Sequence, residues 1–254
     1  MSITTETTAQ DVTAAEVTEL PAGIVARFHT TAAALDRALR ISVLAASTDN
    51  TLPILHGVAL TYTAAGNVAV MATDRYKLVY ALVETVTEDK DGKLPHVVEA
   101  LTTPAVIPLP EVKALTAWVK PLVKALGAWG NLTVSLERTD TAATPDRLTV
   151  TAPTGSAYVV ELVDGEYPRI AGLFPEAVTD QVGTYAVNPT YLEHVAKMAK
   201  LGCERNTPVV FTTGATAGKP VQFRGASDGK LIFHGLLMPV RLPDTGTSYN
   251  AERI

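Results

Sequence analysis

The sequence contains a single cysteine, few aromatic residues (6%) and no long uninterrupted hydrophobic run. One cysteine, Cys203, excludes an internal disulfide and a metal site built from several cysteines. No stretch approaches the roughly 18–20 consecutive apolar residues that a transmembrane helix needs. The N-terminal segment has neither the basic nor the apolar region of a secretory signal. Because 47% of the residues are hydrophobic, the chain can bury a real core. These features predict a soluble, cytoplasmic protein with no membrane segment.

Catalytic motifs are missing as well. The five histidines do not stand at metal-ligand spacings, and no phosphate-binding glycine loop or G-x-S-x-G turn is present. Asp74 has no visible catalytic partner within its motif, and an aspartate in a tight turn commonly bonds its own backbone. Cys203 ends an apolar helix, which favours a structural thiol over a nucleophile. We therefore expect no enzymatic activity, cofactor or metal; a hydrolase using Asp74 or Cys203 is the catalytic alternative.

From Gly23 onward, the order strand, helix and three strands occurs three times. The first two units, at about 22–86 and 101–165, are expected to form one domain with a linker reaching residue 175. The third unit, at 176–243, is expected to form a C-terminal half-domain. Residues 1–21 and 244–254 are expected to be flexible tails. This order predicts an α+β protein with helices on one face of extended, mainly antiparallel sheets.

Each expected helix has recognisable end signals. Thr30 or Thr31 can cap the first helix, and Asn188 followed by Pro189 can start the third, which should end at Gly202. Pro121 falls inside the second helical pattern, so a kink or two short helices are expected there.

All three helices carry basic residues on roughly one side, although the net charge of the whole chain is −5. Solvated helix faces are often rich in lysine, and this simple explanation stays open. If the three helices lie on the same side of the sheets, however, they form a positive surface suited to sequence-independent contact with duplex DNA phosphates. The residues concerned are Arg37, Arg40, Lys113, Lys120, Lys124, Lys197, Lys200 and Arg205.

Four short segments resemble, in the same order, motifs of the bacterial DNA polymerase III beta subunit, the sliding clamp. "LPILHGVAL" and "ATDRYKLV" are similar to a strand and the A-T-D loop of that family's middle domain, "VDGEYPRIAGLFP" to its linker, and "GLLMPVRL" to its C-terminal strand. The resemblance implies the DNA-clamp fold, in which half-domains place helices on the inner face and sheets on the outer face of a ring. It also implies a non-enzymatic processivity factor that encircles double-stranded DNA and tethers a replicative DNA polymerase.

The resemblance further implies a cleft where DNA polymerase and clamp-loader peptides dock. Leu55, Leu78 and Leu236 could instead be core residues, and Arg75 and Lys77 could be solvated turn residues. Carried over by position, the cleft residues are Leu55, Thr73, Arg75, Tyr76, Lys77, Leu78, Pro168, Leu173, Leu236 and Met238.

The number of units bears on self-association. Three half-domains are recognised, where the resemblance implies six in a bacterial subunit and twelve in a ring. A closed ring would then need four copies of this chain; a trimer requires a ring with a different number of half-domains. The short length hints at a phage or mobile element. The alternative function is a clamp-derived interaction protein that binds replication factors without encircling DNA.

Overall fold

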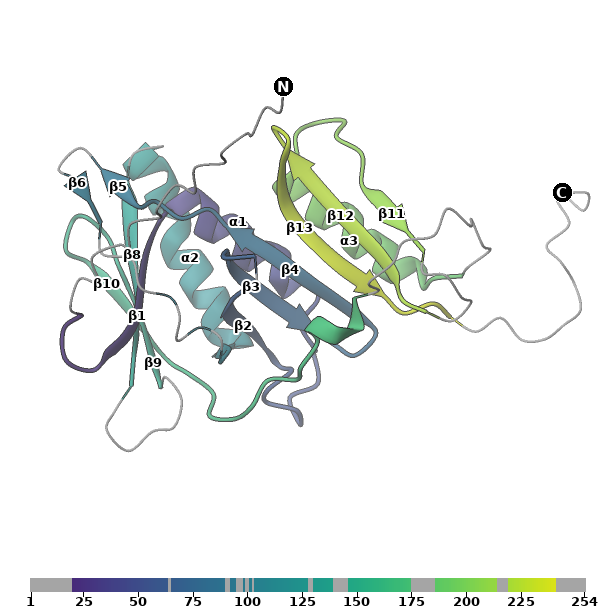
Figure 1. Cartoon of the computed structure of the whole chain (residues 1–254), viewed down its shortest axis with the longest axis horizontal. Coiled ribbons are helices and arrows are strands. Elements are labelled where there is room, and N and C mark those ends of the chain that lie inside the picture. The colour runs from purple at the N-terminus through teal and green to yellow at the C-terminus, as the bar shows by residue number, and fades with distance from the viewer. Residues whose placement is uncertain are drawn as a thin grey trace, which may run out of the picture.

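The structure is a computed structural model that describes residues 20–63, 65–89, 92–94, 98, 101, 103–127, 130–138, 146–174, 186–213 and 219–240. Within these residues the order foreseen from the sequence is complete in two units, and its helix and three strands recur in a third (Figure 1). Unit 1 consists of β1 (Ile24–Thr31), α1 (Ala32–Val43), β2 (Gly57–Tyr62), β3 (Val68–Thr73) and β4 (Lys77–Val83). Unit 2 consists of β7 (Ala105–Pro108), α2 (Leu109–Leu126), β8 (Asn131–Glu137), β9 (Arg147–Thr151) and β10 (Ala157–Glu161). Unit 3 contains α3 (Pro189–Gly202), β11 (Val210–Thr212), β12 (Val221–Ser227) and β13 (Lys230–Leu237).

Short elements connect the units. Between units 1 and 2, β5 (Glu88–Asp89) pairs with β6 (Gly92–Lys93), and between units 2 and 3 lies a 3-10 turn, η3 (Ala171–Leu173). Most of the expected N-terminal tail, the whole expected C-terminal tail and most of the expected first strand of unit 3 lie outside the described residues. In the described part of the chain, no helix is both long and apolar enough to cross a bilayer.

Units 1 and 2 exchange their first strands. β1 leaves its own unit and pairs antiparallel with β8, which gives a four-stranded sheet in the order β1-β8-β9-β10. Reciprocally, β7 of unit 2 pairs antiparallel with β2 of unit 1. Since α1 and α2 also contact each other, the two units form one interlocked body.

Unit 3 joins this body through β13, which pairs antiparallel with β4. The result is a seven-stranded sheet in the order β11-β12-β13-β4-β3-β2-β7. Gly235 permits the close approach, because a Cβ at that position would lie 2.2 Å from the backbone oxygen of Leu78. The junction places α3 beside α1, on the same side of the large sheet.

The helix ends follow their sequence signals, with one exception. The Thr31 hydroxyl accepts the Ala34 N–H at 3.1 Å, and the Asn188 side chain accepts the Thr190 N–H at 2.9 Å. Of the two alternatives expected at Pro121, a kink or two short helices, the division into two helices is wrong, because α2 is a single helix. Pro121 has no backbone N–H and cannot donate a hydrogen bond to the carbonyl of Ala117. Both residues lie on the exposed side of α2, so water can donate a hydrogen bond to that carbonyl instead.

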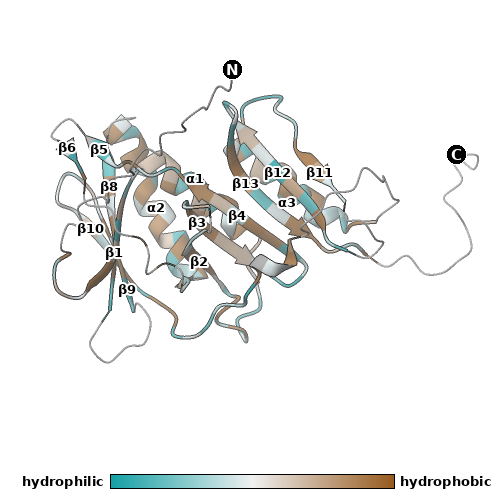
Figure 2. Ribbon diagram, viewed as in Figure 1, coloured by the Kyte–Doolittle hydropathy of each residue, from teal (hydrophilic) through white to brown (hydrophobic). Residues whose placement is uncertain are grey.

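The central strands are buried on both faces. All of β3, and all of β2 except Tyr62, is buried, and the hydrophobic colouring of Figure 2 extends along β3 and β4. Alternate residues such as Val79 and Ala81 pack against the main core beneath the helices. The intervening residues belong to a second apolar cluster on the other face, which includes Tyr167 and Ile170 from the linker after unit 2. The linker therefore takes the place that helices take on the opposite face.

Candidate functional site

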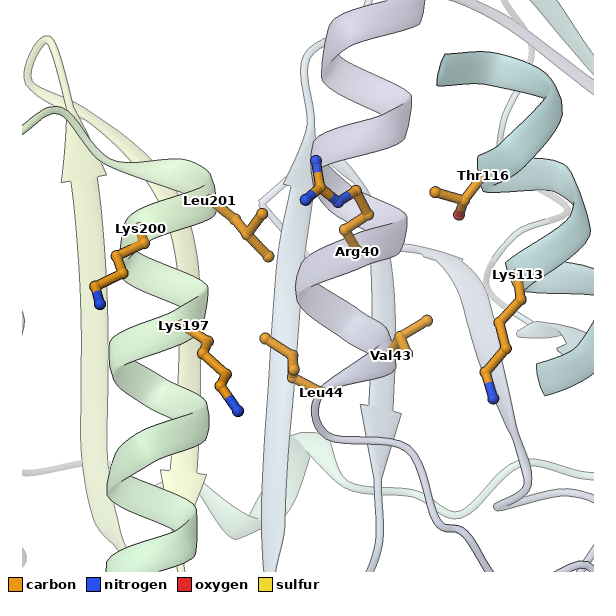
Figure 3. A pocket seen from close by; sticks show the side chains of 8 residues that line it. All are labelled: Arg40, Val43, Leu44, Lys113, Thr116, Lys197, Lys200 and Leu201. Carbon is orange, nitrogen blue, oxygen red and sulfur yellow. The ribbon is translucent and has the colours of Figure 1, made fainter. Parts of the chain in front are cut away.

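Three helices bring four basic side chains around one hollow. Arg40 comes from α1, Lys113 from α2, and Lys197 and Lys200 from α3 (Figure 3). The hollow has a volume of about 510 Å³. Its other lining residues are Val43, Leu44, Thr116 and Leu201. The sequence pattern predicts that these lysines and this arginine lie on the surfaces of their separate helices. The fold places all four on one common surface.

Two of the basic side chains on this face form weak, solvent-exposed ion pairs within their own helices. Arg40 lies 3.4 Å from Asp36, and Lys197 lies 2.7 Å from Glu193, each within one turn of its own helix. The hydrogen bond from Lys197 lowers the pKa of the Glu193 carboxyl. Because both basic side chains are about half exposed, such pairs contribute little to stability and can be exchanged for an external anion.

The other expected basic residues occupy different positions. Lys120 and Lys124 are exposed on α2, and Arg205 is exposed beyond the end of α3; none of them lines the hollow. Arg37 is half-buried, and its Nε has no hydrogen-bond partner. The hydrogen bond from Lys230 lowers the pKa of the Glu84 carboxyl, and the nearby Arg37 charge lowers it further. Arg37 thus lies near the end of β4 and outside the hollow.

Cys203 lies near Arg37 but has the properties of a structural thiol. The side chain is half-buried, and burial raises the thiol pKa, which outweighs the opposite effect of the Arg37 charge. A raised pKa leaves little thiolate at neutral pH. Across the described ranges, no group of three or more His, Cys, Asp or Glu side chains is arranged to hold a metal.

A second candidate region lies on the opposite face of the large sheet. Leu78 of β4 and Leu236 of β13 face each other in the strand register, and both are buried in the second apolar cluster. Tyr167 and Ile170 of the linker complete the cluster. The Tyr167 hydroxyl is buried near the Thr73 backbone but does not reach hydrogen-bond geometry, and burial raises its pKa.

An aromatic group fixes the end of the linker to the sheet. His234 of β13 lies 5.1 Å from Tyr80 of β4 and 4.9 Å from Phe174 of the linker, measured between ring centroids. Burial lowers the pKa of His234 and raises that of Tyr80, so both rings stay neutral near pH 7. Ile54 packs against the cluster, whereas Leu55, the expected cleft residue, does not belong to it.

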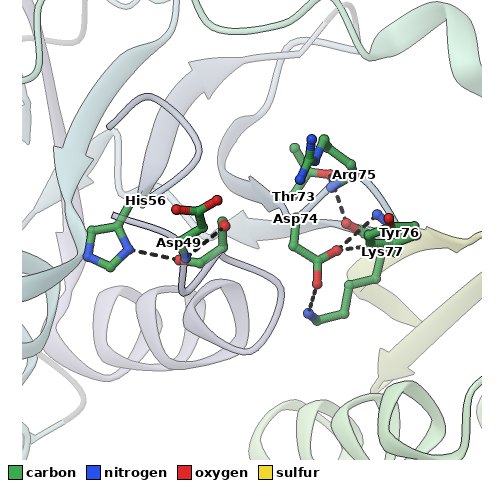
Figure 4. A network of polar contacts seen from close by, with 8 residues as sticks. Asp49, His56, Thr73, Asp74, Arg75, Tyr76 and Lys77 are labelled. Atoms are coloured by element: carbon green, nitrogen blue, oxygen red, sulfur yellow. Dashed lines mark hydrogen bonds and ion pairs between the residues drawn. The ribbon is translucent and has the colours of Figure 1, made fainter. Parts of the chain in front are cut away.

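The loop between β3 and β4 is organised by Asp74 (Figure 4). Its carboxylate accepts the backbone N–H groups of Tyr76 at 3.0 Å and Lys77 at 2.8 Å. The Thr73 hydroxyl donates to the Lys77 carbonyl at 2.8 Å and accepts the Arg75 N–H at 3.1 Å. Arg75 has a φ of 78°, a left-handed conformation that this hydrogen-bonded turn stabilises. The expected turn-shaping role of Asp74 is confirmed.

Two expectations about this loop are wrong. Asp74 does have a side-chain partner, because the Lys77 ammonium forms an ion pair with its carboxylate. Lys77 is also neither a cleft rim residue nor a solvated turn residue: its side chain is 6% exposed and lies 5.0 Å from the centroid of the Tyr191 ring of α3. Strand geometry explains the difference, since neighbours on a strand point to opposite faces and Leu78 points toward the linker. Tyr76 stacks on the same Tyr191 ring at 6.5 Å.

The expected cleft residues therefore differ in burial. Leu78, Leu236, Thr73 and Lys77 are buried, and Leu55 is half-buried. The exposed ones include three large side chains, Tyr76 at 55%, Leu173 at 54% and Met238 at 40% exposure, together with Pro168 and Arg75. The Met238 N–H donates to the Tyr76 carbonyl at 2.8 Å, so these two residues adjoin. The cluster residues that the sequence did not identify include Ile54, Tyr80, Tyr167, Ile170 and Phe174. It also did not identify His234, whose ring packs against Tyr80 and Phe174.

Comparisons with known proteins give one sequence relative and several structural neighbours. No family model matches the sequence. The beta sliding clamp of Micrococcus luteus is 32% identical over 184 residues, which cover 72% of this chain and 51% of the relative. The chain thus spans about half the length of the curated relative it matches. A DNA polymerase sliding clamp from Pseudomonas aeruginosa aligns with a TM-score of 0.63 and 13% identity over 89% of this chain and 68% of that chain. The DNA polymerase III beta chain of Streptococcus pneumoniae aligns with a TM-score of 0.60 and 18% identity over 89% and 67%.

Proposed function

We propose that this chain, a homologue of the bacterial beta sliding clamps with the DNA-clamp fold, is a DNA sliding clamp that encircles duplex DNA and tethers a DNA polymerase. In this function the protein is a non-enzymatic processivity factor that acts where the DNA is, in the cytoplasm of a bacterium or an infected cell. Copies of the chain associate into a ring, with four copies per ring if the ring contains twelve units.

The observation that carries this proposal is the meeting of basic side chains from three helices on one face. Arg40, Lys113, Lys197 and Lys200 surround one hollow although the chain as a whole is acidic. Their positions on three successive units form a stripe across the helices, and a curved array of such units would present this stripe to a duplex passing through the ring. Binding to phosphates alone is independent of sequence.

The chemistry of this face also fits a clamp that slides. Exposed lysine and arginine groups that exchange an intrahelical carboxylate for a phosphate gain little free energy at each phosphate. No single ion pair therefore fixes the register on DNA, and topological enclosure retains the clamp.

The opposite face suits the docking of short apolar peptides from the polymerase and the clamp loader. Met238 and Leu173 provide exposed apolar surface near the buried Leu78–Leu236 pair, and Tyr76, whose ring stacks on Tyr191 of α3, borders this surface beside Met238. Apolar anchors on such a surface, with backbone groups at its border, are typical of small peptide sites. Thr73, Asp74 and Lys77 act as the scaffold that holds Tyr76 in place.

Duplex binding by charge variants tests the role of the basic face. We expect the double variant Lys113→Ala/Lys200→Ala to bind a short duplex more weakly, with fluorescence anisotropy measured at several salt concentrations. The slope of log K against log salt should fall by about 0.9 for each phosphate that the variant no longer neutralises. Arg169→Ala is the control for loss of a basic side chain elsewhere, because Arg169 is 94% exposed, lies on the linker and does not line the hollow. A double variant with the wild-type slope contradicts the assignment.

A further inference from the structure

The three units share a backbone hydrogen bond that identifies equivalent positions. After its last strand, each unit returns to the segment that precedes its helix. The N–H of Val86 donates to the His29 carbonyl at 2.8 Å, and the N–H of Val163 donates to the Val106 carbonyl at 2.9 Å. In unit 3, the Val240 N–H donates to the Ala186 carbonyl at 2.7 Å. Ala186 therefore occupies the position that β1 and β7 occupy in the first two units.

In units 1 and 2, this first strand has a second neighbour. It pairs with the second strand of the companion unit: β1 with β8, and β7 with β2. The second strand of unit 3 is β11, which ends the seven-stranded sheet (Figure 1). Among the described residues, no strand pairs with the outer edge of β11. Unit 3 thus has a first-strand position, at Ala186, that matches the strands exchanged by units 1 and 2, and a free edge strand, β11, that matches the strands receiving them. Within the part of the chain that the structure describes, no other unit pairs with either.

The exposure of apolar side chains independently indicates that unit 3 lacks the neighbouring unit that units 1 and 2 provide for each other. The fourth residue of each helix is apolar: Leu35 in α1, Val112 in α2 and Leu192 in α3. Leu35 is 3% exposed and Val112 is fully buried, whereas Leu192 is 42% exposed. On β11, Val210 and Phe211 are likewise among the exposed large hydrophobic residues. The apolar surface that units 1 and 2 bury is open in unit 3.

We propose that unit 3 pairs with unit 3 of a second copy of this chain. The β11 edge of each copy receives the backbone at Ala186 and Val187 of the other, and the two α3 helices pack together around Leu192. The exchange between units 1 and 2 already relates two like units reciprocally, so two identical units with the same donor and acceptor are self-complementary. This inference rests on the proposed self-association into a ring and assigns one of its interfaces.

The test measures self-association of the full chain by sedimentation equilibrium, without DNA or peptide. The wild type is expected to form at least a dimer. Leu192→Lys on α3 and Phe211→Lys on β11 each place an unpaired charge in the interface and should weaken association by about tenfold or more. Both positions are already exposed, so the variants should retain the far-ultraviolet circular dichroism and cooperative unfolding of the wild type.

Val159→Lys is the matched control, because Val159 is 53% exposed on β10, at the edge of the other sheet. It should leave the unit 3 dimer intact. A monomeric wild type overturns the proposal, as does wild-type affinity in either Leu192→Lys or Phe211→Lys. Loss of the dimer in Val159→Lys also overturns it, because the interface then lies elsewhere. A chain whose association does not respond to Leu192→Lys or Phe211→Lys, but which is retained on circular DNA and released from linear DNA, refutes this interface alone. A dimer of the expected sensitivity without DNA retention refutes the clamp function alone.

Discussion

Leu78 and Leu236 lie directly opposite each other in the antiparallel pairing of β4 with β13, although they come from distant parts of the chain. The pair joins unit 3 to unit 1 and also forms the base of the candidate peptide surface. Docking at this surface therefore depends on the same strand pairing that holds the units together. Substitutions there must be chosen so that binding is separated from folding.

Met238→Asp makes that separation possible. Leu78 is too deeply buried for an acidic substitution, whereas Met238 is partly exposed at the end of β13. An aspartate at 238 would set an unpaired charge against an apolar ligand side chain. We expect the affinity for an apolar polymerase-type peptide to fall about tenfold or more, measured by isothermal titration calorimetry. Val159→Asp is the control of similar exposure on a distant strand. Equal peptide affinity in wild type and Met238→Asp would refute the docking assignment.

The Asp74–Lys77 pair should contribute to stability. Asp74→Asn keeps an oxygen that can accept the turn N–H groups but removes the carboxylate that compensates the buried Lys77 ammonium. We expect a loss of roughly 2–4 kcal/mol in the free energy of unfolding, determined with urea. The double variant Asp74→Asn/Lys77→Met removes the charge as well and should recover part of that loss. Additive effects of the two substitutions would show that the pair is not coupled.

The linker should loosen in acid through His234. Because burial lowers its pKa, folding favours the neutral ring, and the stabilisation is fully present above the ordinary value of 6.5. It is lost as the pH falls through the lower folded-state pKa. Thermal unfolding should show a larger decrease in Tm between about pH 7.5 and about pH 5 in the wild type than in His234→Phe, which keeps a ring between Tyr80 and Phe174. His194, whose pKa is also lowered by burial, is present in both proteins. Identical pH profiles would contradict this role.

Local sequence signals were sufficient for most of the fold. The helix caps at Thr31 and Asn188, the three amphipathic helices and the strand order depend on residues close together in the chain, so their patterns are readable. Pro121 does not divide α2, because the cost of an interior proline depends on whether the carbonyl left without a donor meets water, which is a property of the packed helix.

The candidate surfaces were only partly predictable. Basic residues on three helices were recognisable, but the inward position of Arg37 depends on how α1 packs. The alternation of β4 could have assigned Lys77 to the helix side, opposite Leu78. Tyr167 and Ile170 belong to an irregular linker without periodicity, so tertiary packing alone determines which residues they touch.

The most direct test of the clamp proposal is retention of the protein on circular DNA. The chain is loaded on nicked circular duplex DNA, with a clamp loader if needed, and bound protein is separated by gel filtration before and after a single restriction cut. Encirclement predicts that the protein stays on the circle and dissociates once the DNA is linear, because it can then slide off the ends. Equal retention on circular and linear DNA, or no retention on either, would contradict it.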